Sequence, residues 1–318
     1  MFKSNVIHKC ALVSISLMLN VGFANADVLS LNDALRATYT ACVGIDDELA
    51  DLKKMAGINT AVTAVGTAAG VGATTVGLVK ASKDKQIADL EAKLQKLKQL
   101  TENKQIIAPN REEVLNGMNV YYNDNKDETK NIESDIAVLN KQSKSLGKWR
   151  TGLVAGSAAT NVAGAIIANK NKVDVDLETQ IEDCKLAVKN LRESINQARF
   201  SGEDVREATE ILNACKEYDY VDISPINKRG KGAFVSSVVG ATTGLAGTVT
   251  SAMANTDKTR DDNTEAGKQK EKNLNVAANI LSGTTAVASG VATVFNATQI
   301  SAIKKVSAVA EKCTEVLK

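Results

Sequence analysis

The sequence has very little histidine, proline or aromatic character. Among 318 residues there are one histidine, two prolines and 3% Phe, Trp and Tyr. The histidine, His8, lies in an N-terminal segment that we expect to be removed. The mature chain then has no histidine for a Ser-His-Asp site, a Cys-His site or a histidine-bound metal ion. With few prolines to interrupt them, long helices are expected. We therefore predict an all-α, non-enzymatic protein without a cofactor.

The N-terminus has the pattern of a secretory signal peptide. Lys3 and Lys9 provide a positive start, residues 11–23 are apolar, and Ala24 and Ala26 match the small-x-small pattern of a cleavage site. The apolar run is too short for a transmembrane anchor. We predict removal of residues 1–26, export from the cytoplasm, and a final location in the periplasm or the envelope membrane of a Gram-negative-type bacterium.

Removal of this segment balances the charge. Without Lys3 and Lys9 the 39 basic residues fall to 37, against 37 Asp and Glu. Nucleic-acid binding needs a basic surface and often stacking aromatic rings, so it is not expected. No glycine-rich segment continues into the Gly-Lys-Ser/Thr of a phosphate loop, and no small-molecule substrate is evident.

Two kinds of helical segment alternate along the chain. Apolar residues at steps of four and three, typical of coiled-coil seams, occur within residues 31–52, 87–97 and 177–195. Other stretches contain no charged residue and consist largely of Ala, Gly, Val, Thr and Ser. At about 1.5 Å per residue, each is long enough to cross a hydrocarbon core of about 30 Å. There are four of them, at residues 58–79, 151–168, 232–255 and 274–303.

The four small-residue stretches are related by an internal repeat. Each contains a glycine followed by three small residues, with another small residue seven positions after the glycine. We interpret the chain as two duplicated helical hairpin units, residues 27–198 and 199–318. The first unit has a long coiled-coil arm over about residues 81–146, whose tip we expect as a polar loop at residues 108–127.

The four cysteines of the mature chain suggest two disulfides, as in other exported proteins. Cys42 and Cys215 precede the repeat glycine of the first stretch in their unit by 24 and 25 residues. Cys184 and Cys313 follow the glycine of the second stretch by 28 and 30 residues. An antiparallel hairpin with this spacing brings its two cysteines together. We predict the pairs Cys42–Cys184 and Cys215–Cys313, with four free thiols in helix seams as the alternative.

Glycines and small residues recur every four positions in the stretches. This pattern permits close helix packing, and in lipid it is the GxxxG mode of association. In a water-exposed helix each glycine costs about 1 kcal/mol relative to alanine, so close packing has to offset that cost. The glycines that we predict at helix contacts are Gly66, Gly70, Gly152, Gly156, Gly164, Gly240, Gly244, Gly283 and Gly290.

The sequence does not decide whether lipid or protein surrounds these helices. Trp149, between Lys148 and Arg150, resembles a membrane-interface anchor, although it also suits a cap over a hairpin core. Asparagines within the stretches argue against lipid, because their amides would need partners in hydrocarbon. They are Asn59, Asn161, Asn275, Asn279 and Asn296.

Our interpretation is a cell-envelope protein that associates with or spans a lipid membrane through its Gly/Ala-rich hairpins. Its role would be structural or interaction-based, with the coiled-coil arm serving self-association or contact with protein partners. One alternative is a secreted pore-forming protein, because long amphipathic helices with Gly/Ala-rich hairpins resemble those of helical pore-forming toxins, without a shared motif. The other is a soluble periplasmic helical-bundle adaptor or chaperone.

Overall fold

A computed structural model of the chain describes residues 29–105, 112–260 and 264–318. The predicted signal peptide lies outside these residues. Within them every regular element is a helix, which confirms the all-α prediction. The helices are α1 (Leu31–Cys42), α2 (Ile45–Gln105), α3 (Glu112–Lys170), α4 (Val175–Phe200), α5 (Arg206–Cys215), the 3-10 helix η1 (Lys216–Tyr220), α6 (Ser224–Ala254), α7 (Asp257–Arg260) and α8 (Glu265–Leu317).

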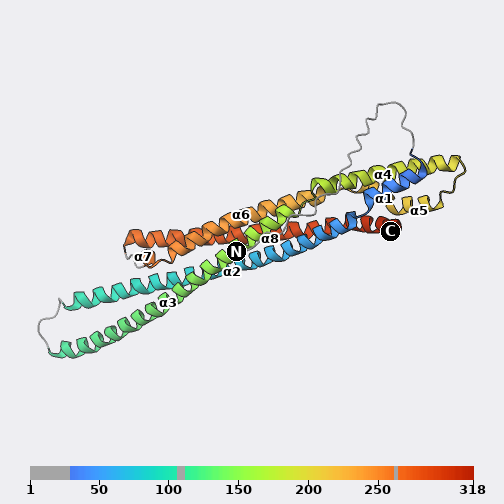
Figure 1. Cartoon of the computed structure of the whole chain (residues 1–318). Helices are drawn as coiled ribbons and strands as arrows, with labels where there is room; N and C mark the ends of the chain where they lie inside the picture. Colours follow the sequence, from blue (N-terminus) through green and yellow to red (C-terminus); the bar gives the residue numbers. More distant parts are fainter. Residues whose placement is uncertain (1–28, 106–111, 261–263) are drawn as a thin grey trace, which may run out of the picture.

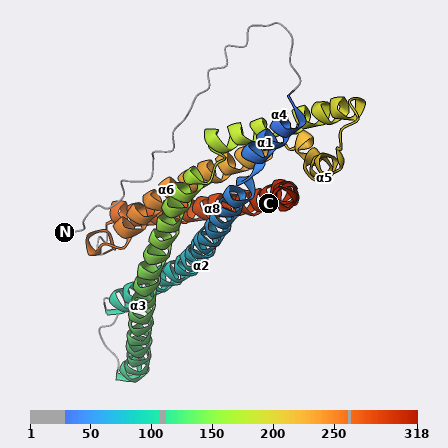
Figure 2. The ribbon, with the colours of Figure 1, turned by 45° about the vertical axis from the view of Figure 1, so that its right-hand side comes forward.

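The molecule is a long rod of helices (Figure 1). Four of them, α2, α3, α6 and α8, form a bundle in which both α2 and α6 pack against α3 and α8. At one end, α1, α4, α5 and the C-terminal part of α8 form a head (Figure 1), to which η1 also belongs through its contacts with α4, α5 and α8. At the other end the α2–α3 hairpin diverges from α6 and α8 as an arm, seen most clearly in Figure 2. The two predicted hairpin units therefore share one bundle.

One periodic seam holds the bundle together. Buried residues follow one another along each bundle helix at alternating steps of four and three, the average spacing of left-handed coiled-coil packing. The seam residues are large and aliphatic near the head and are mostly Gly, Ala, Ser, Thr and Asn in the middle of the bundle. In α6 they are Ile226, Gly230, Ala233, Ser237, Gly240, Gly244, Gly247, Ser251 and Ala254.

Two disulfides close the head. Cys42 of α1 is bonded to Cys184 of α4, and Cys215 of α5 is bonded to Cys313 of α8. This is the pairing that the spacing predicts. All four cysteines are buried in an apolar core of Leu, Ile, Val and Ala side chains. The bonds join residues 142 and 98 positions apart. In the chain-entropy model, loops of about a hundred residues or more contribute roughly 4–5 kcal/mol each.

The helices differ from the predicted pattern in two places. The seam over residues 31–52 predicts one helix, but the chain turns at Gly44, whose φ of 97° favours glycine, so α1 and α2 are separate. The predicted polar loop at residues 108–127 is largely helical, because α3 begins at Glu112. The Asn, Asp and Gly residues of this segment favour a loop, yet Glu112 and Glu113 lie in the first turn of α3, where acidic side chains stabilise a helix N-terminus.

Candidate functional site in the four-helix bundle

The interior of the small-residue part of the bundle is polar. Asn59 of α2 donates from Nδ2 to Oδ1 of Asn296 in α8 at 2.9 Å. Further from the head, Asn161 of α3 donates to the hydroxyl oxygen of Ser289 at 2.7 Å. All four side chains are fully buried. The amides that would be costly in hydrocarbon therefore point inward and bond between helices.

Arg150 is the largest fully buried side chain in the part of the chain that the structure describes. It enters the interior from α3 at the arm end of the bundle. Its Nε donates to Ser251 Oγ at 3.0 Å, Nη1 to Asn279 Oδ1 at 3.1 Å, and Nη2 to Asn275 Oδ1 at 2.9 Å. Neutral acceptors from α6 and α8 thus hold a guanidinium, which stays charged in proteins.

A second buried cation lies next to Arg150, toward the arm. Lys80 of α2 is 1% exposed, and its Nζ lies 2.6 Å from Asp84 Oδ2 and 3.6 Å from Glu271 Oε1. The hydroxyl of Ser143 in α3 donates to the other oxygen of Asp84. With Arg150, this cluster has two cations and two carboxylates. Buried ionised groups are costly unless they are paired and hydrogen-bonded, and these are.

The outer surface of the same part of the bundle is apolar. We call residues 58–79, 151–168, 232–254 and 274–300 the apolar belt. Eighteen of its Val, Ile, Leu and Met side chains are exposed, among them Val65, Leu245 and Val287. The exposed polar side chains of the belt are four threonines, and each donates its hydroxyl to the carbonyl four residues earlier in its own helix. They are Thr75, Thr242, Thr284 and Thr298.

No protein-family model, curated protein or solved structure matches this chain. The dimensions of the belt are therefore the main guide to its surroundings. By length and composition, four helical stretches, which include the belt segments of α2, α3, α6 and α8, can cross a membrane. From Asn279 beside Arg150 to Gln299 near the head, α8 advances about 30 Å at ~1.5 Å per residue, which matches a hydrocarbon core.

Several predicted glycines lie where two helices almost touch. A Cβ atom on Gly70 would come within 2.9 Å of Ala286 Cα, and one on Gly244 within 3.0 Å of Ala158 Cα. Neither position has room for a side chain unless the backbones separate. The other close contacts among the predicted glycines face Thr160, Thr63 and Asn161, at Gly66, Gly164 and Gly240 respectively.

The remaining predicted glycines are not at close helix contacts. A Cβ atom on Gly152, Gly156 or Gly283 would have no non-local atom within 4 Å, and one on Gly290 would make only an ordinary contact at 3.8 Å. The reason is geometric. Each step of four residues turns by about 40° around an α-helix. A row of glycines at this spacing that faces the bundle at Gly164 therefore points about 120° away from it at Gly152.

Trp149 lies at the arm-side edge of the belt and is 68% exposed. An indole that is this exposed buries little of the hairpin core, the role that was the alternative to an interface position. Its two neighbours in sequence differ in burial: Lys148 is exposed, whereas Arg150 is fully buried. Its exposure at the end of the apolar belt is compatible with the predicted membrane-interface role, which stays a prediction.

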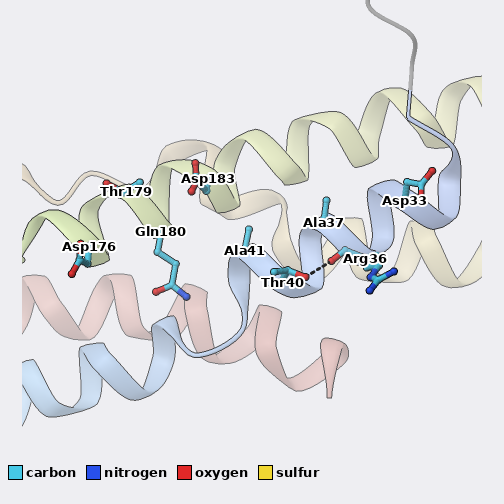
Figure 3. Close-up of a pocket in the computed structure, with 9 residues that line it drawn as sticks. All are labelled: Asp33, Arg36, Ala37, Thr40, Ala41, Asp176, Thr179, Gln180 and Asp183. Atoms are coloured by element: carbon cyan, nitrogen blue, oxygen red, sulfur yellow. Dashed lines mark hydrogen bonds between the residues drawn. The ribbon is translucent and has the colours of Figure 1, made fainter. Parts of the chain in front are cut away.

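The head has an open groove of about 870 Å³ between α1 and α4 (Figure 3). Gln180 of α4 reaches toward the turn after α1, where its amide donates to the Val43 carbonyl at 3.2 Å. Nearby, burial raises the pKa of Glu48, and the negative charges of Asp174 and Asp176 raise it further. This face of the head is acidic and lies outside the bundle. The groove is lined by Asp33, Arg36, Ala37, Thr40, Ala41, Asp176, Thr179, Gln180 and Asp183.

Proposed function

We propose that this protein spans a membrane of the cell envelope with α2, α3, α6 and α8 and has a structural or interaction role without catalysis. The arm, which projects beyond the bundle, then serves self-association or contact with protein partners. Export by the N-terminal signal and four crossings leave both disulfides on one side of the membrane. That agrees with a head exposed to an oxidising compartment.

The observation that carries this proposal is the reversed polarity of the bundle. A helix bundle in water buries apolar side chains and exposes polar ones. Here the seam of the belt is rich in Asn, Ser, Thr and Gly, while its surface is Val, Ile, Leu and self-bonded Thr. Soluble monomers rarely expose apolar patches beyond a few hundred Å². An apolar belt around all four helices fits lipid better than water.

Replacing Val287 with arginine tests the proposal. Val287 lies near the middle of the α8 belt and is 68% exposed. In lipid the new charge costs about 2–4 kcal/mol near the membrane midplane, so we expect V287R to lose most of its membrane-bound fraction. The measurement is the share of processed protein recovered with membranes, at matched expression.

The matched control is V138R, which places the same charge on the arm, outside the belt, at a residue that is 53% exposed. We expect V138R to be recovered with membranes as the wild type is. If V287R and V138R behave alike, the belt does not face lipid, and a soluble periplasmic adaptor becomes the better account.

A second candidate, a pore-forming protein, is favoured by one specific feature. Polar side chains run along the interior for the whole length of the belt, from Gln299 to Arg150. Such a row would line an aqueous path if the helices separated. Release of a trapped dye from vesicles by the purified protein would support this candidate. Stable insertion without release would support the structural role.

A further inference from the structure

A ring of basic residues surrounds the bundle where the belt meets the head. Every bundle helix contributes to it. At this level Gln299 of α8 donates to the carbonyls of Asn171, just past α3, and of Ile226 in α6, so the helix ends are in register. We call this ring the basic collar. Its members are Lys53, Lys54, Lys170, Lys172, Lys228, Arg229, Lys231, Lys304 and Lys305.

The collar cations form no ion pairs with carboxylates in the described residues. No collar residue has a carboxylate within 4 Å in the described part of the chain, and most collar side chains are exposed. Two of them are held near the bundle surface: Arg229 donates to the Thr298 carbonyl at 2.6 Å, and Lys172 lies 5.2 Å from the ring of Phe234. Of the collar cations, Lys228 acts electrostatically on a carboxylate, that of Asp222, whose pKa it helps to lower. The collar is therefore a zone of positive charge in which no cation is locked in an ion pair with a described carboxylate.

The opposite end of the belt is different. There Lys80 is paired with Asp84 and Glu271, and Lys144 lies 2.8 Å from Asp257. Charges at the arm end are thus largely neutralised within the protein. At the head end no collar cation is within 4 Å of a carboxylate in the described residues, so these cations are open to an anion from outside. Like charges repel one another unless counter-charges lie among them.

We propose that the basic collar binds the headgroups of anionic phospholipids in the leaflet next to the head. The inference rests on the proposed membrane-spanning function and extends it. The collar borders the apolar belt directly, so a lipid whose acyl chains lie against Val291 and Val294 has its phosphate at the depth of the collar. Lysine ammonium groups and the Arg229 guanidinium are suited to pair with phosphate.

The test compares lipids retained by three forms of the full mature chain in bilayer discs with equal phosphatidylglycerol and phosphatidylcholine. The collar variant K54Q/K170Q/K231Q/K304Q removes one exposed lysine from each bundle helix. The control K96Q/K130Q/K189Q/K216Q removes four exposed lysines from the arm and the head. Native mass spectrometry of the released protein counts each bound lipid. We expect the wild type and the control to retain phosphatidylglycerol over phosphatidylcholine by roughly fivefold or more.

The collar variant is expected to lose most of this preference while still entering the discs. Equal retention of the two lipids by the wild type, or an equal loss of preference in both variants, would overturn the collar proposal and leave the membrane-spanning function standing. Failure of the wild type to enter discs at all would overturn both. Disc incorporation and lipid preference are separate readouts, so the two failures are distinguishable.

Discussion

Alanine at both Gly70 and Gly244 is expected to destabilise the bundle by about 2–6 kcal/mol, from about 1–3 kcal/mol for each overpacked contact. The added Cβ atoms would lie 2.9 Å from Ala286 Cα and 3.0 Å from Ala158 Cα, so the backbones of two helix pairs must move apart. No rotamer change relieves this contact, because the opposing atoms are the backbone and the Cβ atom of alanine, which has no side-chain rotamers. Denaturant unfolding of purified protein in detergent measures the effect.

The control is the double variant G152A/G156A, which adds the same two methyl groups on α3. Nothing non-local lies within 4 Å of either Cβ position, and both glycines are exposed. Alanine also favours a helix over glycine by about 1 kcal/mol per residue, so we expect unchanged or higher stability. Equal destabilisation by the two double variants would mean that the helices do not pack as described.

Replacing Arg150 with methionine is expected to cost about 2–5 kcal/mol of stability, because it leaves several buried polar groups without their partner. Ser251, Asn279 and Asn275 each lose the donor that now satisfies them. Methionine fills much of the volume, so the loss reports the polar contacts more than a cavity. Thermal unfolding in detergent, followed by helical circular dichroism, is the measurement.

Lys148→Met provides the matched control. It removes the same charge from the same helix, two residues away, but from an exposed side chain. A change within about 0.5 kcal/mol is expected, as for other surface substitutions. If R150M is as stable as K148M, the buried arginine does not organise the arm end of the bundle.

The sequence predicted those features that depend on spacing along the chain. The near-equal distances from repeat glycine to cysteine gave both disulfides, because they follow from the length of two antiparallel helices. The α4 seam was also predictable, and its Ile181, Val188 and Leu191 are fully buried. Large apolar residues at steps of four and three identify the buried face of a helix without help from tertiary structure.

The buried face of the small-residue stretches was harder to predict, because Gly, Ala and Ser do not mark a buried face by their size. A spacing of four picked out Gly152 and Gly156, which face outward. Extending the seam of steps four and three from Leu49 through Ala56 and Asn59 leads to Gly66 and Gly70, which were predicted, and also to Lys80, which was not. The same rule on α3 leads to Arg150.

The polar interior could not be predicted from composition. Five asparagines counted against lipid when each was considered alone. Their bonds to one another, to Arg150 and to a serine on another helix answer that objection, and those bonds depend on how four helices are aligned in the bundle. The outward Thr hydroxyls likewise count as polar in the sequence, yet each is bonded to its own helix.

The most direct test of a membrane-spanning bundle is to fractionate cells that express and process the protein and to wash the membranes with sodium carbonate. Carbonate removes peripheral proteins and leaves integral ones in the pellet. The reversed polarity of the belt predicts that the protein stays in the washed pellet and is released only by detergent. Recovery of the processed protein in the soluble periplasmic or secreted fraction would contradict it.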